Sequence, residues 1–210
     1  MPLPVPRLYA LADVGVLGLE ATPEAVAKMA RVGIRWIQIR AKGVAGGALF
    51  RLVEGVLEAV KDTPSRIWLD DRVDVAALVP VSGVHLGQRD LPPQQARRVL
   101  GDDPWIGFST HDADQVAAAE ADEAVDVVAL GPIFETQSKE RPDPVVGLDG
   151  LRRARQLTKK PLVAIGGIHR GNLSDVLAAG ADSVAILGAV CRGDVVRNCE
   201  GLLAQVKEDS

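Results

Sequence analysis

Aromatic side chains are scarce in this sequence: Phe, Tyr and Trp together make up 3% of its 210 residues, whereas hydrophobic residues make up 47%. A core with so few rings must be built from aliphatic side chains. Continuous aliphatic runs are typical of a parallel sheet covered by helices. The length suits one compact domain. The composition therefore favours a single α/β domain.

Cysteine is scarce as well, with two residues in the chain. Cys191 and Cys199 fall in one expected final helix, so about 12 Å separates them at the helical rise per residue. A disulfide cannot span that distance. We expect two buried thiols in a reducing compartment, with no metal-ligand cluster around them.

Basic stripes and long apolar runs are also missing. The formal net charge is −4, which argues against a nucleic-acid partner. No segment approaches the roughly 18 apolar residues of a membrane span, and residues 1–6 lack the charged lead-in and apolar run of a signal peptide. We expect a cytoplasmic protein with no membrane partner, and the sequence leaves open whether it forms a homo-oligomer.

Eight short apolar segments alternate with helical patterns, and no linker or second domain interrupts them. This count predicts a single-domain (β/α)₈ barrel, or TIM barrel, over residues 1–210, with an irregular lead-in at 1–6. The alternative is a doubly wound open sheet, but no GxGxxG motif follows the first strand. The strands are expected at residues 8–12, 34–40, 66–69, 83–86, 105–108, 125–130, 162–165 and 183–187.

Glycines follow the last two expected strands: Gly166 and Gly167 after the seventh, and Gly188 after the eighth. Glycine at a strand-to-helix junction lets backbone N–H groups approach a ligand, and the start of the next helix favours an anion. Two such junctions at the end of a barrel chain are the usual phosphate site. The alternative is that the glycines only make tight turns.

Polar residues interrupt the second expected strand. With a period of two, Trp36, Gln38 and Arg40 share one face, and Lys42 follows just beyond. In a barrel this face points into the lumen, so these polar side chains are expected at its mouth. The alternative is an edge strand with solvated charges.

Two neighbouring strand ends carry acidic residues, Asp71 and Asp90. Carboxylates that converge on a barrel mouth suit Mg²⁺, which keeps several waters and takes phosphate oxygens as its other ligands. An Asp after a strand is also a common helix N-cap. This alternative is stronger for Asp71 than for Asp90, which precedes two prolines.

Ser109, Thr110 and His111 end the fifth expected strand. Ser109 is a candidate to hydrogen-bond a leaving oxygen, and either hydroxyl is a candidate cap for the next helix. His111 is a candidate acid or base, or a half-buried residue of the first helical turn. The sequence alone does not choose between these roles.

The longest irregular stretch, 131–147, is rich in proline and polar residues. Loops of more than about 12 residues in a compact domain tend to be functional or disordered. Hydroxyls and cations on this loop suit a mobile active-site lid that closes on anions. They belong to Thr136, Ser138, Lys139 and Arg141.

The motifs in these segments, taken in order, resemble those of the thiamine-phosphate synthase family over nearly the whole chain. They are QIRAK (38–42), DDRVD (70–74), GVHLGQRD (83–90), GFSTH (107–111), GPIFETQSK (131–139), AIGGI (164–168) and AILGA (185–189). The resemblance implies a transferase that joins hydroxymethylpyrimidine diphosphate to thiazole phosphate, giving thiamine phosphate and pyrophosphate with Mg²⁺ required. It implies a dissociative substitution, in which pyrophosphate leaves and the thiazole nitrogen captures the pyrimidinylmethyl cation.

The resemblance also implies roles for single residues, with these small molecules as the partners. Asp71 and Asp90 hold Mg²⁺, and Gln38 orients the pyrimidine. Arg40, Lys42 and Lys139 hold the diphosphate, and Ser109 steadies the leaving oxygen, with Arg40, Ser109 and Lys139 as the catalytic set. The thiazole side and its phosphate are held by Thr136, Ser138, Gly166, Gly167 and Gly188.

Three positions depart from the family pattern. Asp70, in the substrate-binding set, stands where the family usually has Asn, and an ionised carboxylate only accepts where an amide can donate. Ser138 replaces Thr but keeps the hydroxyl. Gly188 replaces Ser, which removes one hydroxyl from the thiazole phosphate. We expect that change to weaken phosphate binding by about 0.5–3 kcal/mol.

Other functions are compatible with the same barrel. The thiazole tautomerases share it and use a histidine equivalent to His111 for proton transfer, but they typically lack the diphosphate-binding residues. A non-catalytic barrel that binds a phosphorylated ligand is a further alternative, motivated by Asp70 and Gly188. An unrelated phosphate-handling barrel enzyme is the last.

Overall fold

The computed structural model describes residues 5–136 and 143–208. Over these residues, eight parallel strands close into a barrel in chain order, and β8 returns to pair with β1. The predicted (β/α)₈ barrel is confirmed. The strands are β1 (Leu8–Asp13), β2 (Trp36–Arg40), β3 (Arg66–Asp70), β4 (Gly83–Leu86), β5 (Trp105–Thr110), β6 (Val127–Leu130), β7 (Leu162–Ile165) and β8 (Ser183–Ile186).

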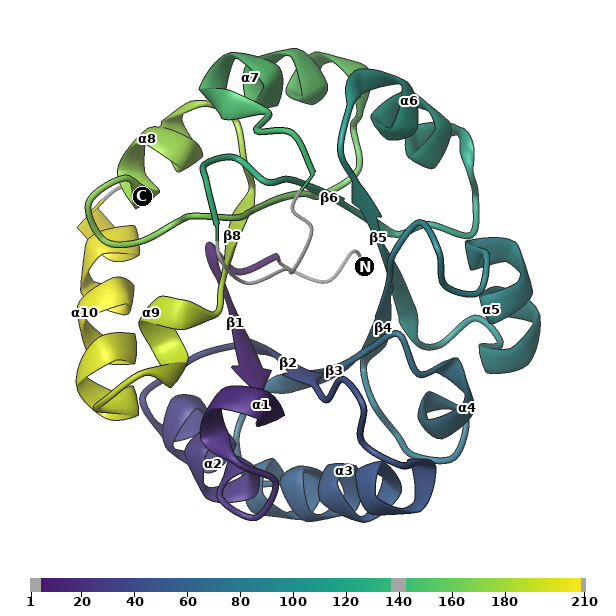
Figure 1. Ribbon diagram of the computed structural model, residues 1–210, viewed down its shortest axis with the longest axis vertical. Coiled ribbons are helices and arrows are strands. Elements are labelled where there is room, and N and C mark those ends of the chain that lie inside the picture. The colour runs from purple at the N-terminus through teal and green to yellow at the C-terminus, as the bar shows by residue number, and fades with distance from the viewer. Residues whose placement is uncertain (1–4, 137–142, 209–210) are drawn as a thin grey trace.

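Helices follow the strands and form a ring around the barrel (Figure 1). Two of them, α1 and α9, are single four-residue turns that the sequence pattern does not predict. None of the helices among the described residues is long and apolar enough to cross a membrane. The helices are α1 (Val14–Leu17), α2 (Thr22–Arg31), α3 (Gly46–Val60), α4 (Val73–Ala76), α5 (Pro93–Leu100), α6 (Ala113–Ala121), α7 (Gly147–Leu157), α8 (Leu173–Ala178), α9 (Gly188–Cys191) and α10 (Val195–Glu208).

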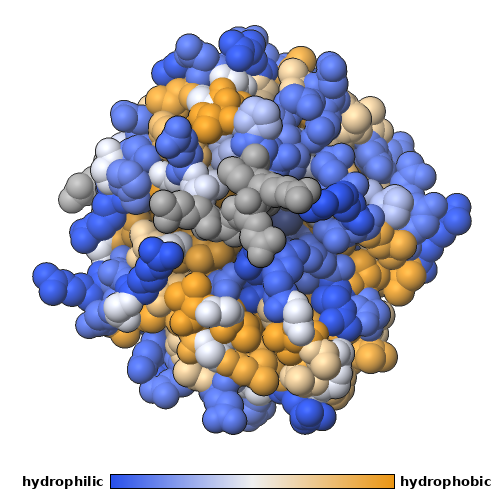
Figure 2. All heavy atoms as spheres, viewed as in Figure 1, coloured by the Kyte–Doolittle hydropathy of each residue, from blue (hydrophilic) through white to orange (hydrophobic). Residues whose placement is uncertain are grey.

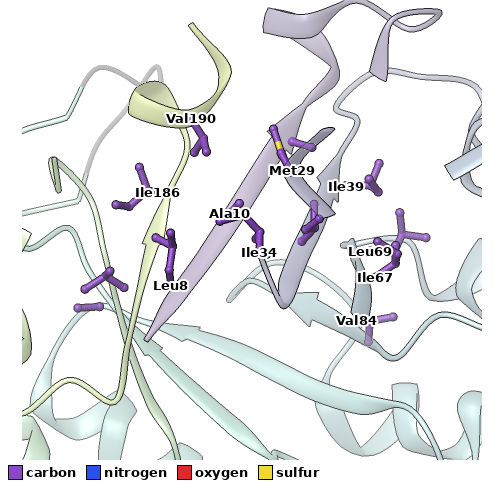
Figure 3. Close-up of a cluster of buried hydrophobic side chains, with 14 of the residues drawn as sticks. Leu8, Ala10, Met29, Ile34, Ile39, Ile67, Leu69, Val84, Ile186 and Val190 are labelled. Carbon is purple, nitrogen blue, oxygen red and sulfur yellow. The ribbon is translucent and has the colours of Figure 1, made fainter. Parts of the chain in front are cut away.

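Alternate side chains of each strand face the helices or the lumen, as the period of two requires. Figure 3 shows part of the outer layer, where Leu8 and Ala10 of β1 lie near Met29 of α2 and Ile186 of β8. Every one of these side chains is almost completely buried. This aliphatic layer between strands and helices is the main core of the protein.

The lumen holds the tryptophans and the tyrosine. All three tryptophans and the single tyrosine of the sequence pack there, with Trp36 and Trp68 ring centres 4.8 Å apart. Tyr9 stands edge-on to Trp36, and Trp105 stands edge-on to both Trp36 and Trp68. Because these rings come early in their strands, they fill the lower lumen and leave polar residues for the carboxyl ends.

The expectation that both cysteines lie on one helix is wrong. Cys191 ends α9 and Cys199 lies in α10, because Gly193 takes a left-handed conformation (φ 76°) and breaks the helix between them. Both cysteines are free and buried, as predicted. Burial raises the pKa of the Cys199 thiol to about 12, so this thiol stays protonated.

Candidate active site

A cavity of about 800 Å³ opens at the carboxyl ends of the strands. Figure 2 shows hydrophilic residues gathered near the centre of one face of the protein. Six of the predicted site residues line the cavity. They are Arg40, Ser109, Thr136, Gly166, Gly167 and Gly188.

Five other predicted residues are not among those that line this cavity over the described chain: Gln38, Lys42, Asp70, Asp71 and Asp90. Four of these five form a charged cluster next to Arg40, whereas Gln38 is buried in the lumen. Ser138, Lys139 and Arg141 lie outside the described residues, as does that part of the predicted lid 131–147. The structure thus places two groups of predicted residues side by side. One lines the cavity and is rich in glycine, and the other is the charged cluster next to Arg40.

Arg40 joins the two groups. At the end of β2 its guanidinium makes an ion pair with Asp13, its register partner at the end of β1. Its Nε lies 3.9 Å from Asp70 Oδ2. Because Asp13 is only 5% exposed, this buried carboxylate fixes the guanidinium at the cavity wall.

Lys42 contacts both neighbouring carboxylates. Its Nζ hydrogen-bonds Asp71 Oδ2 and lies 3.4 Å from Asp70 Oδ2. Partial burial acts against the charge on Lys42, but the charge of Asp70 and the hydrogen bond to Asp71 raise its pKa above the ordinary value. The ammonium therefore stays charged at the mouth of the barrel.

Hydrogen bonds with the backbone fix the positions of Asp71 and Asp90. Asp71 has a left-handed φ of 61°, and its N–H donates to the carbonyl of His85 on the next strand. Asp90 Oδ2 accepts from Gly87 N at 2.7 Å. Among the described residues, Arg72 and not Asp71 is the N-cap of α4, and no side chain caps that helix. The N-cap alternative for Asp71 is therefore wrong.

The two carboxylates interact with each other. Burial raises the pKa of Asp71, the hydrogen bond and charge of Lys42 act against that rise, and Asp90 adds to it. No cluster of three or more His, Cys, Asp or Glu side chains suited to a metal occurs within 5–136 and 143–208. A cation held here would have two protein carboxylates as ligands and would take its remaining ligands from water or substrate.

Asp70 lies deeper than Asp71. Burial and the neighbouring charge of Asp71 raise its pKa from 3.8 to about 6, although Lys42 and Arg40 oppose the rise. Because the folded chain holds this proton more tightly than the unfolded chain does, the stability that it contributes is present at low pH and is lost as pH rises through about 6.

We expect Asp70→Asn to remove this pH dependence. In buffer with a metal chelator, the free energy of unfolding of the parent chain should fall relative to the variant by about 1–3 kcal/mol between pH 4 and pH 7. Urea unfolding of both proteins across this range measures the difference. Asp62→Asn, at an exposed position, is the matched control. Parallel stability curves for parent and Asp70→Asn would contradict the assignment.

Gln38 is 3% exposed and lies below the mouth of the barrel. Its Nε2 donates to the hydroxyl of Tyr9 at 3.2 Å. Burial and the charge of Asp70 raise the pKa of Tyr9 well above its ordinary value, so the phenol stays neutral. This contact fixes the amide between the aromatic floor and the polar rim.

At the end of β5, the structure shows which residue caps the next helix. Thr110 is buried and donates to the carbonyl of Ala129, and the helix cap is Asp112, which accepts from Gln115 N. Neither Ser109 nor Thr110 is thus the cap of α6. Ser109 lines the cavity.

His111 lines the same cavity. Its Nδ1 lies 2.5 Å from the carbonyl oxygen of Gly131, and its Nε2 lies 3.5 Å from Asp143 Oδ2. A carbonyl only accepts, so Nδ1–H donates to it, and Nε2 faces the carboxylate.

The loop that follows β6 packs closely against the two glycines after β7. Gly166 and Gly167 have φ values of 100° and 67°. A Cβ on Gly166 would lie 2.6 Å from Pro132 Cα, and one on Gly167 would lie 2.6 Å from the carbonyl oxygen of Glu135. Both positions therefore require glycine for conformation and for space, and they bring bare backbone to the cavity.

Three residues with contacts in this site are missing from the sequence prediction: Asp13, His85 and Asp143. Asp13 and His85 show the same pattern as Arg40, since each is a polar residue on the lumen face of a strand. This pattern could have predicted both. Asp143 lies in an irregular loop with no pattern to mark it. Its place beside His111 depends on how the loop folds back.

A parallel barrel with charged and glycine-lined walls around one cavity at the carboxyl ends of its strands is the arrangement of a (β/α)₈-barrel enzyme. Residues 8–190 match the family model described as thiamine monophosphate synthase. The thiamine-phosphate synthase of Koribacter versatilis (strain Ellin345) is 43% identical over 191 residues, which cover 88% of this chain and 89% of the relative. The chain therefore belongs to the thiamine monophosphate synthase family.

Further matches agree. The thiamine-phosphate synthase of Chloroflexus aurantiacus (strain ATCC 29366 / DSM 635 / J-10-fl) is 40% identical, over 90% of this chain and 87% of the relative. The solved structure of thiamine phosphate pyrophosphorylase from Pyrococcus furiosus superposes with a TM-score of 0.87 at 31% identity, covering 97% of this chain and 96% of that one. The predicted family, the thiamine-phosphate synthase activity and the transferase class are confirmed.

Proposed function

We propose that this chain joins hydroxymethylpyrimidine diphosphate to thiazole phosphate at the mouth of the barrel, with Mg²⁺. The main support for this proposal is that the glycine-lined cavity and the charged cluster lie next to each other. Arg40 lines the cavity together with Gly166 and Gly188, and it also contacts the carboxylate cluster. Such a site accommodates two phosphorylated substrates, one at each end, with their reacting groups between.

The charged end suits the diphosphate. In a dissociative substitution, negative charge grows on the departing pyrophosphate, so preorganised cations lower the barrier. Arg40 and Lys42 are held by Asp13, Asp70 and Asp71, which fixes them before substrate binds. We assign Lys139 to the same role from the family pattern.

The donor set fits Mg²⁺. Asp71 and Asp90 are close enough for the charge of Asp90 to raise the pKa of Asp71, so a divalent cation between them would relieve their repulsion. Mg²⁺ favours oxygen ligands and is usually bound by one or two carboxylates plus substrate phosphates. When bound, Mg²⁺ would neutralise charge on the diphosphate. Asp71 and Asp90 would hold it, and Lys42 beside Asp71 would add a second positive charge.

The glycine-lined end suits the thiazole phosphate. Bare backbone at Gly166 and Gly167 faces the cavity, and the hydroxyl of Thr136 lines it from the loop after β6. We assign Ser138 to this side from the family pattern, and Gln38 to the pyrimidine ring. We assign Ser109, which lines the cavity at the end of β5, to donate to the leaving oxygen.

Gly188 offers room for the serine that the family usually has. A Cβ there would meet no described atom within 4 Å. We expect Gly188→Ser to lower KM for thiazole phosphate by roughly 2- to 10-fold, the worth of one added hydrogen bond, with KM for the pyrimidine diphosphate unchanged. Steady-state kinetics check this. Gly188→Ala adds the Cβ without the hydroxyl, so equal KM values in both variants would contradict the assignment.

Pyrophosphate release tests the proposed function. Purified protein is mixed with pyrimidine diphosphate, thiazole phosphate and Mg²⁺, and each component is omitted in turn. We expect release only with all three, with thiamine phosphate formed in equal amount. No release, with thiazole phosphate still bound, would overturn the synthase proposal. Proton exchange on the thiazole in a His111 variant would then test the tautomerase alternative.

We propose that the enzyme works in the cytoplasm. Cys191 and Cys199 are free and buried, which suits the reducing cytoplasm. The residues assigned above all belong to one chain, so a homo-oligomer would not be needed to complete the site.

A further inference from the structure

His85 lies directly behind Ser109. It is the third residue of β4, and its Nε2 lies 2.9 Å from Ser109 Oγ on β5. Ser109 lines the cavity, whereas His85 is not among the described residues that do so. The imidazole therefore meets the cavity wall at the serine hydroxyl.

A glycine on the neighbouring strand makes room for the ring. Gly107 is the register partner of His85, and a Cβ there would lie 2.5 Å from His85 Nδ1 and 3.2 Å from Cε1. Gly107 is not one of the glycines with positive φ among the described residues. Space, not backbone conformation, thus requires glycine at this position, because the imidazole lies against it.

The backbone of Ser109 is fixed as well. Gln88 Nε2 donates to the Ser109 carbonyl at 2.7 Å, and the carbonyl of His85 accepts from Asp71 N at 2.9 Å. With the main chain held on both strands, the remaining freedom at Ser109 is the rotation of its side chain and hydroxyl. A serine hydroxyl has one hydrogen to donate and two lone pairs to accept.

We propose that His85 is a positioning residue: its Nε2–H donates to Ser109 Oγ and thereby leaves the serine hydrogen for the leaving oxygen of the diphosphate. The inference deepens the proposed function and rests on it for the identity of the acceptor. It adds a half-buried residue, in contact with Ser109, to the groups that act on the departing pyrophosphate.

A double-mutant cycle tests the coupling in pyrophosphate release. We expect Ser109→Ala to lower kcat about 100-fold, and His85→Leu to lower it about 10-fold because the hydroxyl remains but is misdirected. The double variant should fall within about threefold of Ser109→Ala, since neighbours that act as one unit are not additive. His85→Gln, whose amide can donate from the same place, should recover activity to within about threefold of the parent. A double variant that loses the product of both single effects would overturn the proposal.

A spectroscopic comparison makes the test independent of turnover. In protein labelled with ¹⁵N-histidine, Ser109→Ala should shift the His85 Nε2 resonance and speed exchange of its proton. An unchanged resonance would overturn the contact, even if the parent chain proved inactive and the synthase proposal failed. If the parent is active and the resonance shifts, a His85→Leu variant with parental kcat would still overturn the positioning role.

Discussion

Asp90→Asn is expected to reduce Mg²⁺-dependent turnover by about 100-fold or more, because it removes one of two carboxylates from the proposed metal pair. Asparagine keeps an oxygen that can accept from Gly87 N, the contact that Asp90 Oδ2 makes in the structure. The variant should therefore fold like the parent and lose affinity for the metal.

The measurement is kcat as a function of Mg²⁺ concentration, together with the thermal midpoint of unfolding. Asp102→Asn is the matched control, because Asp102 is exposed and precedes β5, at the opposite end of the barrel from the cavity. Near-parental kcat and metal dependence in Asp90→Asn would remove Asp90 from the metal site.

Gly166→Ala is expected to have the second large effect. The new Cβ would lie 2.6 Å from Pro132 Cα, and the residue would keep a φ of 100° that alanine rarely adopts. Backbone strain of this kind costs about 1–3 kcal/mol, and the displaced loop would spoil the proposed phosphate cradle. We expect lower stability and a KM for thiazole phosphate raised at least roughly tenfold, a loss of about 1.4 kcal/mol.

Gly101→Ala separates strain from displacement. Gly101 also has positive φ (73°), but a Cβ there meets no described atom within 4 Å, and it lies after α5, at the other end of the barrel. The control should lose stability while keeping KM. Equal KM values in Gly166→Ala and the parent would show that this turn does not hold the thiazole phosphate.

The sequence predicts much of this barrel because its signal is local. Each aliphatic run, bounded by polar residues, corresponds to one strand, and the period of two places Arg40 and Trp36 on the lumen face. Six of the strands differ from the expected ranges by one or two residues at one end, since no local pattern marks where strand pairing stops. The short helices α1 and α9 escape notice because four residues carry no periodicity.

The contacts within the site depend on register instead. Asp13 meets Arg40 because β1 and β2 pair with those residues as partners. His85 reaches Ser109 across Gly107 for the same reason. Parallel strands far apart in sequence do not reveal their register, so the sequence predicts which residues reach the rim but not which of them touch. The cysteines show the same limit, since only the break at Gly193 separates their helices.

The claim that one cavity holds a metal diphosphate at one end and a thiazole phosphate at the other is tested most directly by a crystal structure. Crystals grown with thiamine phosphate, pyrophosphate and Mn²⁺ in place of Mg²⁺ would report the metal through its anomalous scattering. We predict a Mn²⁺ peak between Asp71 and Asp90 with pyrophosphate beside Arg40 and Lys42, and the phosphate of thiamine phosphate on the backbone at Gly166. A metal bound elsewhere, or a thiamine phosphate whose phosphate avoids the glycines, would contradict the account.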